Sequence, residues 1–332
     1  MTLDRREVLI ATAAAAAATL GRCAVVANAA SAELPSSPDT TAQYRSVQET
    51  FVPNPIAVST YSFWRFNDDS KLDMVKCIDL AARYGFDAVE LLRIQMEDVV
   101  SDAYLQQLKR QAFVNGLSLC GMSTHQDFVT PDADDRAKNV KLTVELLEMA
   151  YKLGIPTIRV NTGRWNTSKD FDELMANKGI EPVMEGHTDE EGFKWVIDSF
   201  EQCLPTAEKC GVTMGLENHW GLGRTAEGVL RVVDALKSPW MKVTLDTGNF
   251  FERRYEQIEM LAPQTAFVQA KTYFGGGKWY ELETDWPRIA KTLQSANYHG
   301  FISLEFEGKE DYNTAIPKSL AVLREAFGKK YA

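Results

Sequence analysis

The sequence is poor in the residues from which zinc clusters, redox sites and nucleic-acid-binding surfaces are built. Its 332 residues include four histidines and five cysteines, and no two cysteines form the CxxC pair of zinc ribbons or thioredoxin-like sites. Acidic residues outnumber basic ones, so the formal net charge is −10. Such a chain repels nucleic-acid phosphates and is not attracted to anionic membranes. These shortages exclude a nucleic-acid partner and favour a small substrate that is neutral or is bound together with a cation.

The sequence also lacks an apolar run that is convincing as a membrane span. The nearest one, Val8–Leu20, is mostly alanine and is shorter than the roughly 20 residues that a spanning helix needs. Arg5 and Arg6 precede it and small residues follow up to Ala32, which is the pattern of an export signal. The paired arginines resemble a twin-arginine signal. We therefore predict that residues 1–32 direct export to the periplasm, and that no membrane contact remains after their removal; an ordinary secretory signal and an uncleaved anchor are the alternatives.

Beyond a polar leader at residues 33–54, short apolar runs alternate with helical patterns. The apolar runs predict strands at 56–62, 88–92, 117–122, 157–161, 213–217, 242–246, 266–271 and 301–306. The helical patterns lie at 72–84, 104–114, 134–153, 189–211, 225–236, 255–261, 285–296 and 317–327. Strands that alternate with helices pair in parallel. Eight such units predict an α/β protein whose residues 55–332 form a single (β/α)8 TIM barrel. An open doubly wound sheet is the alternative, but no GxGxxG turn follows the first strand.

Two connections in this pattern are long. Residues 162–187 contain Trp165, and residues 273–285 contain Trp279 and Tyr280. Long loops at the active face of a barrel act as lids or substrate walls, so we expect Trp165 to stack on a sugar ring. The sequence leaves open whether these aromatic residues only cover the mouth of the barrel.

Polar residues end four consecutive strands in the second half of the chain. They are Glu217, Asp246, Gln269 and Glu305, each about one strand-and-helix unit from the next. Active residues of a barrel project from the C-terminal ends of its strands, so these four side chains are expected at one rim. Three desolvated carboxylates repel one another unless a cation lies between them. The pattern predicts one divalent metal ion, Mn²⁺ or Mg²⁺, because its ligands are oxygens; helix caps and salt bridges are the alternative roles.

Other polar residues are expected near the same rim. Glu90 ends the second strand and is predicted to hold substrate hydroxyls. His125 and His219 follow the third and fifth strands and are candidate general acids or bases, because imidazole titrates near neutrality; purely structural roles are the alternative. Lys271 is expected either to stabilise a developing oxyanion or to form a salt bridge within the acidic cluster.

Four segments of the chain resemble the xylose-isomerase-like barrels, a family of sugar isomerases, ketose 3-epimerases and related lyases. These segments are Gly85–Leu91, Gly215–His219, Leu245–Asn249 and Ser303–Glu305.

The resemblance implies that Glu217, Asp246 and Glu305 bind one metal ion and that Glu217 and Glu305 also move protons beside a carbonyl. Many members have a histidine as the remaining ligand, where this chain has Gln269. Members also often have a histidine at the position of Asn249, which we expect to contact substrate. Gln269 can still bind a metal through its carbonyl oxygen but predicts weaker binding or an altered metal preference, and both differences argue against simple epimerase chemistry.

These features predict a metal-dependent isomerase or epimerase that removes a proton beside a carbonyl of an unphosphorylated sugar. A lyase or hydratase that acts on a 3-keto-glycoside is the main alternative, since that reaction begins with the same proton abstraction. A carbohydrate-binding protein without activity is a more distant one. The DNA-repair endonucleases of the same superfamily need more histidines and a basic groove. The sequence is compatible with a homo-oligomer but does not predict one.

Overall fold

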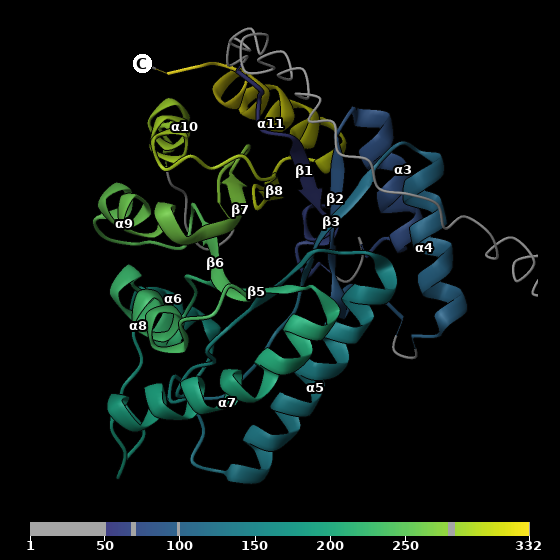
Figure 1. Ribbon diagram of the computed structural model, residues 1–332. Helices are drawn as coiled ribbons and strands as arrows, with labels where there is room; N and C mark the ends of the chain where they lie inside the picture. The colour runs from purple at the N-terminus through teal and green to yellow at the C-terminus, as the bar shows by residue number, and fades with distance from the viewer. Residues whose placement is uncertain (1–50, 68–70, 98–99, 278–282, 332) are drawn as a thin grey trace, which may run out of the picture. The chain divides into compact units, whose positions relative to one another are not determined.

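The computed structural model describes residues 51–67, 71–97, 100–277 and 283–331 (Figure 1). The predicted export signal and residues 33–50 of the predicted leader lie outside these ranges, as do Trp279 and Tyr280. In the described ranges, no helix has the length and apolar character needed to cross a membrane.

Eight parallel strands close into a barrel in sequence order, and β8 pairs with β1 (Figure 1). The strands are β1 (Ile56–Ser59), β2 (Ala88–Leu92), β3 (Ser118–Ser123), β4 (Thr157–Val160), β5 (Thr213–Glu217), β6 (Met241–Asp246), β7 (Thr265–Thr272) and β8 (Ile302–Phe306). The predicted TIM barrel is therefore confirmed. Two strands, β2 and β5, have the predicted bounds, and the others differ from them only at their ends.

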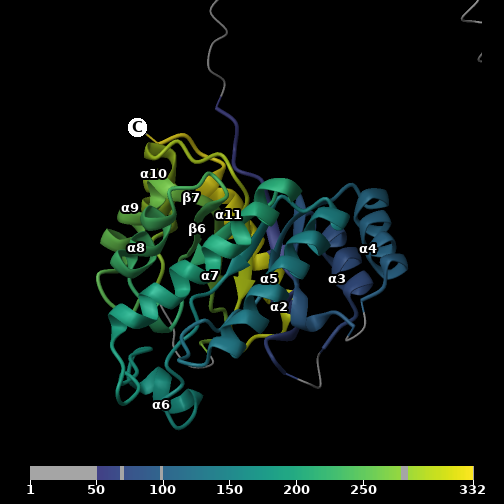
Figure 2. The ribbon, with the colours of Figure 1, turned by 60° about the horizontal axis from the view of Figure 1, so that its bottom comes forward.

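Helices cover the outside of the barrel, as Figures 1 and 2 show from two directions. The helices are α2 (Tyr61–Trp64), α3 (Met74–Tyr84), α4 (Asp102–Val114), α5 (Ala133–Leu153), α6 (Phe171–Ala176), α7 (Asp189–Cys210), α8 (Ala226–Leu236), α9 (Arg254–Leu261), α10 (Trp286–Ser295) and α11 (Tyr312–Phe327). A short 3₁₀ turn, η4 (Gly221–Gly223), follows β5. The long helices α5 and α7 pack against each other.

The ends of the main helices follow from local sequence. At its N-terminus, α7 has a capping box, in which Thr188 accepts from the backbone N–H of Glu191 and the Glu191 side chain accepts in return. Gly85, Gly154 and Gly211 end α3, α5 and α7 in the left-handed conformation, which glycine adopts without steric cost. These signals are visible in the sequence, which is why most helix bounds could be predicted closely.

Three local predictions are wrong. The first strand ends at Ser59, because the chain turns there into the helical turn Tyr61–Trp64. The long loop after β4 contains an unpredicted helix, α6, which Asp170 caps. The last helix begins at Tyr312, well before the predicted Pro317, because Asp311 provides an N-cap and the proline is accommodated inside the helix.

Strand pairing is irregular at two points. Val89 of β2 pairs with Leu119 and Glu90 pairs with Gly121, so β3 has one extra residue there. Val243 of β6 pairs with Thr265 and Thr244 pairs with Phe267, so β7 also has one extra residue. Both irregularities lie just below the strand ends that hold polar residues, where bulges commonly re-aim side chains.

Candidate active site

The polar side chains expected at the rim gather at the C-terminal ends of the strands. Glu90, Glu217, Asp246, Gln269, Lys271 and Glu305 are all buried, with 0–7% of each residue exposed. Below them, Ala57, Ala88, Cys120 and Phe267 form a separate apolar cluster inside the barrel. A Cβ added to Gly121 would lie 3.0 Å from the Phe267 ring, so glycine lets this ring fill the floor of the site.

One part of the cluster joins Glu90, Gln269 and Glu305. The amide nitrogen of Gln269 donates to Oε1 of Glu90 at 2.7 Å and to Oε1 of Glu305 at 3.0 Å. Ser303 donates to Oε2 of Glu90 at 2.6 Å, and Ser123 donates to its Oε1. Glu90 is thus surrounded by donors, and its partners come from β3, β7 and β8.

Glu217 is held by a second set of donors. Arg159 Nη1 lies 2.7 Å from Glu217 Oε2, and Asn161 Nδ2 donates to the same oxygen at 2.8 Å. Asn249 Nδ2 donates to Oε1 at 3.2 Å. Only 7% of the Arg159 side chain and 1% of the Glu217 side chain are exposed, so this ion pair is shielded from solvent.

Lys271 connects the two sets. Its ammonium donates to Asn249 Oδ1 at 2.8 Å and lies 3.4 Å from Asp246 Oδ2, 3.1 Å from Glu307 Oε1 and 3.9 Å from Glu305 Oε2. Because this donation leaves the Asn249 amide nitrogen directed to Glu217, Lys271 also fixes the orientation of that amide. The predicted salt bridge of Lys271 within the acidic cluster is therefore present in the structure.

The surroundings separate the acidities of the carboxyl groups. Burial acts to raise the pKa of Glu217, but the charges of Arg159, His219 and Lys271 outweigh it and lower this pKa to about 2. Burial raises the pKa of Asp246 to about 7, against the opposing charge of Lys271. Burial also raises the pKa of Glu305 far above its usual value. The surroundings therefore favour the ionised form of Glu217 and the protonated form of Glu305, so the two glutamates differ in acidity although they share one rim.

Two buried oxygen atoms bear on the expected metal ion. Asp246 Oδ1 accepts hydrogen bonds from the backbone of Gly248 and Asn249, whereas Asp246 Oδ2 and Gln269 Oε1 accept none from the described residues. Buried acceptors of this kind fit a cation that prefers oxygen ligands. The full ligand set is not assembled in this conformation: among the described residues, no three His, Cys, Asp or Glu side chains are placed to hold a metal ion. The donor chemistry thus fits a cation, but Lys271 now lies among the donors.

The two candidate histidines lie beside the Glu217 ion pair. His125 is exposed to solvent, and its Nε2 lies 3.2 Å from Arg159 Nη2. Desolvation by the surrounding side chains and the charge of Arg159 lower the pKa of His125 to about 3. His219 is partly buried against the ring of Trp220, and desolvation lowers its pKa to about 4. Both imidazoles are therefore neutral at physiological pH.

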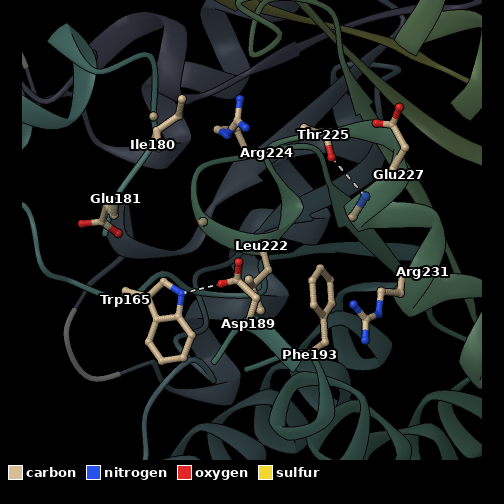
Figure 3. A pocket seen from close by; sticks show the side chains of 13 residues that line it. Trp165, Ile180, Glu181, Asp189, Phe193, Leu222, Arg224, Thr225, Glu227 and Arg231 are labelled. Atoms are coloured by element: carbon tan, nitrogen blue, oxygen red, sulfur yellow. Dashed lines mark hydrogen bonds between the residues drawn. The ribbon is translucent and has the colours of Figure 1, made fainter. Parts of the chain in front are cut away.

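Trp165 lies apart from this cluster. Its ring is 3% exposed, and its Nε1 donates to Asp189 Oδ1 at 3.0 Å. With Phe193, Leu222 and Arg224 it lines a pocket of about 380 Å³, shown in Figure 3, which none of the acidic cluster lines. The structure therefore places the indole in the wall between the loops after β4 and β5, away from the carboxylates.

From the sequence, Arg159 could line the site or face elsewhere, and Asn161 was missed. Both project from the end of β4 toward Glu217. The available signal was their spacing, since residues two apart on a strand share one face. An arginine inside an otherwise apolar strand is a further sign of a buried charged partner.

Comparisons with known proteins agree with this architecture. A family model described as "Xylose isomerase-like TIM barrel" matches residues 78–326. D-psicose 3-epimerase of Ruminiclostridium cellulolyticum is 24% identical over 262 residues, which are 74% of this chain and 81% of the relative. The solved D-psicose 3-epimerase of Clostridium cellulolyticum H10, in complex with D-tagatose, has a TM-score of 0.62 and 20% identity over 82% of this chain and 99% of its own. The 3-keto-D-glucoside 4-epimerase of E. coli has a TM-score of 0.65 and 16% identity over 82% and 99%.

Proposed function

The chain belongs to the xylose isomerase-like TIM barrel family, and from this premise we propose that it is an isomerase or epimerase of an unphosphorylated sugar. The similarity to D-psicose 3-epimerase supports the class of substrate. The observation that carries the proposal is the contrast between two buried glutamates, Glu217 with a lowered pKa and Glu305 with a raised one. Proton abstraction beside a carbonyl needs one carboxylate that accepts a proton and one acid that returns it.

The residues of the site divide this work between them. Glu217 is the base. Arg159 and Asn161 donate hydrogen bonds to its Oε2, and these bonds keep the carboxylate ionised and fixed in position. Glu305 is the second carboxyl group that moves a proton, at the other face of the carbon or at the neighbouring oxygen. Glu90 and Asn249 bind hydroxyl groups, and Lys271 stabilises negative charge that develops on the carbonyl oxygen.

Glu217, Asp246, Gln269 and Glu305 would hold one divalent ion, Mn²⁺ or Mg²⁺, which when bound polarises the carbonyl as a Lewis acid. The uncoordinated oxygens Asp246 Oδ2 and Gln269 Oε1 support this assignment. For Lys271 the proposal means that its ammonium must move aside or share Asp246 with the ion, because it lies 3.4 Å from Oδ2.

The charge balance of the site supports a substrate without phosphate. Five carboxyl groups, those of Glu90, Glu217, Asp246, Glu305 and Glu307, surround two basic side chains, Arg159 and Lys271. Both basic side chains already pair with these carboxyl groups, so a phosphate would have to compete with them for the same two cations.

A lyase or hydratase acting on a 3-keto-glycoside is the second candidate. The similarity of the barrel to 3-keto-D-glucoside 4-epimerase bears on the substrate class alone, and Gln269, which replaces the histidine expected in epimerases, favours the lyase or hydratase reaction. Both reactions begin when Glu217 removes a proton beside the carbonyl; they differ in whether that proton returns or a substituent leaves.

The test uses residues 33–332 with added Mn²⁺, incubated in deuterated water with D-fructose, D-psicose or a 3-keto-glucoside. An epimerised ketose with deuterium beside the carbonyl supports the first candidate, and an unsaturated or cleaved product supports the second. Glu217→Gln should abolish both product formation and deuterium uptake, whereas Glu227→Gln, in an exposed ion pair with Arg253, should be as active as wild type. Sugar binding without turnover and without sensitivity to chelators would refute both and leave a binding protein.

We also propose that the protein is exported to the periplasm through the twin-arginine route, based on Arg5 and Arg6 before the alanine-rich run. Replacing both arginines with lysine should retain the unprocessed chain in the cytoplasm. Periplasmic recovery of this variant at the wild-type level would contradict the route.

A further inference from the structure

His125 has an asymmetric environment at the mouth of the barrel. One ring nitrogen, Nε2, lies 3.2 Å from Arg159 Nη2, within hydrogen-bond distance. Among the described residues, Nδ1 has no such partner. The residue is exposed to solvent, and it follows the end of β3 on the same rim as Glu217.

The chemistry of the guanidinium decides which nitrogen of His125 carries the proton. An arginine side chain has five N–H donors and no acceptor, and it does not lose its proton in proteins. The contact is a hydrogen bond only if Nε2 of His125 is the acceptor. A neutral imidazole has one donor and one acceptor nitrogen, so the proton must lie on Nδ1, the nitrogen that has no partner among the described residues.

Arg159 cannot turn away from His125 easily. Its Nη1 is bound to Glu217 at 2.7 Å, and only 7% of its side chain is exposed. The groups that act on His125 are Arg159 and His219, which oppose its protonation, and Glu217, which favours it from the far side of Arg159. A proton added to Nε2 would face the guanidinium directly and break the bond.

We propose that His125 is a substrate-binding hydrogen-bond donor, locked by Arg159 as the Nδ1–H tautomer, and that it does not act as a general acid or base. This role rests on the proposed sugar substrate, whose hydroxyl or carbonyl oxygen is the natural acceptor for Nδ1–H. Arg159 then positions two groups at once: Glu217, which takes a proton from carbon, and His125, which holds an oxygen nearby. This binding role replaces the general acid or base role that was expected for His125 from its position in the sequence.

The tautomer can be measured without any substrate. The chain has only four histidines, so protein labelled with ¹⁵N-histidine gives few ring signals, and His125→Asn identifies the one that belongs to this residue. We expect a protonated Nδ1, an unprotonated Nε2, and no change in charge state between pH 8 and pH 5. A protonated Nε2, or a titration near pH 6.5, overturns the proposal. In Arg159→Lys, whose single ammonium does not reproduce the fork, the tautomer preference should weaken.

Kinetics on a sugar that wild type turns over test the donor role. An asparagine amide places an N–H near the position of Nδ1, whereas a glutamine amide reaches toward the position of Nε2. His125→Ala should raise KM about tenfold, the effect of one lost hydrogen bond, with His125→Asn closer to wild type than His125→Gln. The pH dependence of kcat should be the same in all of them. If His125→Asn is as impaired as His125→Ala, or if the pH profile loses a limb, the donor role is wrong.

Together, the tautomer measurement and the kinetics distinguish a failure of this inference from a failure of the proposed function. If wild type turns over no sugar but the Nδ1–H tautomer is found, the proposed function and the donor role fail while the control of the tautomer by Arg159 stands. If turnover is found with the Nε2–H tautomer, the function stands and the inference fails.

Discussion

Replacing Arg159 with methionine should destabilise the protein by roughly 3 kcal/mol at pH 7. The variant leaves the Glu217 carboxylate buried, with 1% of its side chain exposed, and without its counterion. Among the charges that lower the pKa of Glu217 to about 2 against the effect of burial, that of Arg159 is the largest, so its removal acts against the ionised carboxylate. Removing one partner of a buried ion pair costs about 3–5 kcal/mol in other proteins, which sets the expected magnitude.

The sign of the pH dependence follows from the lowered pKa. The ion pair contributes fully above pH 4.5, where Glu217 of the unfolded chain is also ionised, and the contribution is lost as the pH falls through about 2. Urea unfolding at pH 7, monitored by circular dichroism, measures the loss of stability in Arg159→Met directly. In thermal unfolding, about 3 kcal/mol corresponds to a decrease in Tm of roughly 6–12 °C.

Two further variants decide whether charge is the cause. Arg253→Met breaks an exposed pair with Glu227 and should cost less than about 1 kcal/mol. Adding Glu217→Gln to Arg159→Met removes the buried carboxylate that has lost its counterion, and this should restore part of the lost stability. The reasoning is refuted if Arg159→Met unfolds like wild type, or if the double variant is no more stable than the single one.

Two other expectations concern stability. Without metal and with a chelator present, Asp246→Asn should gain stability over wild type as the pH rises through about 7. The raised pKa of Asp246 in the folded protein gives wild type a stability that is full below pH 3.8 and is lost as the pH rises through about 7. An equal difference in unfolding free energy between the two proteins at pH 5.5 and pH 8.5 would contradict this prediction. Gly221→Ala should cost about 2–4 kcal/mol, since its Cβ would lie 2.2 Å from the Gly163 carbonyl oxygen, whereas Gly211→Ala, with an equally positive φ but open space, should cost only about 1 kcal/mol. Equal losses in the two glycine variants, measured by urea unfolding, would show that the close approach is relaxed.

The barrel could be predicted because its signals are local and repeated. Strand β5 has its predicted bounds, and the apolar run of Thr213–Glu217 ends on the glutamate that the site uses. The same reasoning located Asp246, the last residue of β6, and Glu305, the last but one of β8, since active residues of a barrel project from the C-terminal ends of its strands.

The partners of these residues could not be predicted in the same way. Strands of a parallel barrel are buried on both faces, so the alternation that would assign Arg159 to the inside is absent from the sequence. Lys271 contacts residues of β6, β8 and the loops beyond them, and such contacts depend on how the closed barrel brings distant segments together. Trp165 shows the same limit for loops, because the sequence did not reveal that its Nε1 donates to Asp189 Oδ1.

One extra residue in each of β3 and β7 lies between the lower part of the barrel and the strand ends that carry the polar side chains. Because side chains alternate in direction along a strand, each insertion reverses the inward and outward faces of everything after it. Shortening β7 by one residue below Gln269 would present Ala270 where the amide now lies, and shortening β3 would withdraw Ser123 from Glu90. A single-codon deletion in either strand is therefore expected to change which side chains line the rim, while the strand below the deletion keeps its register.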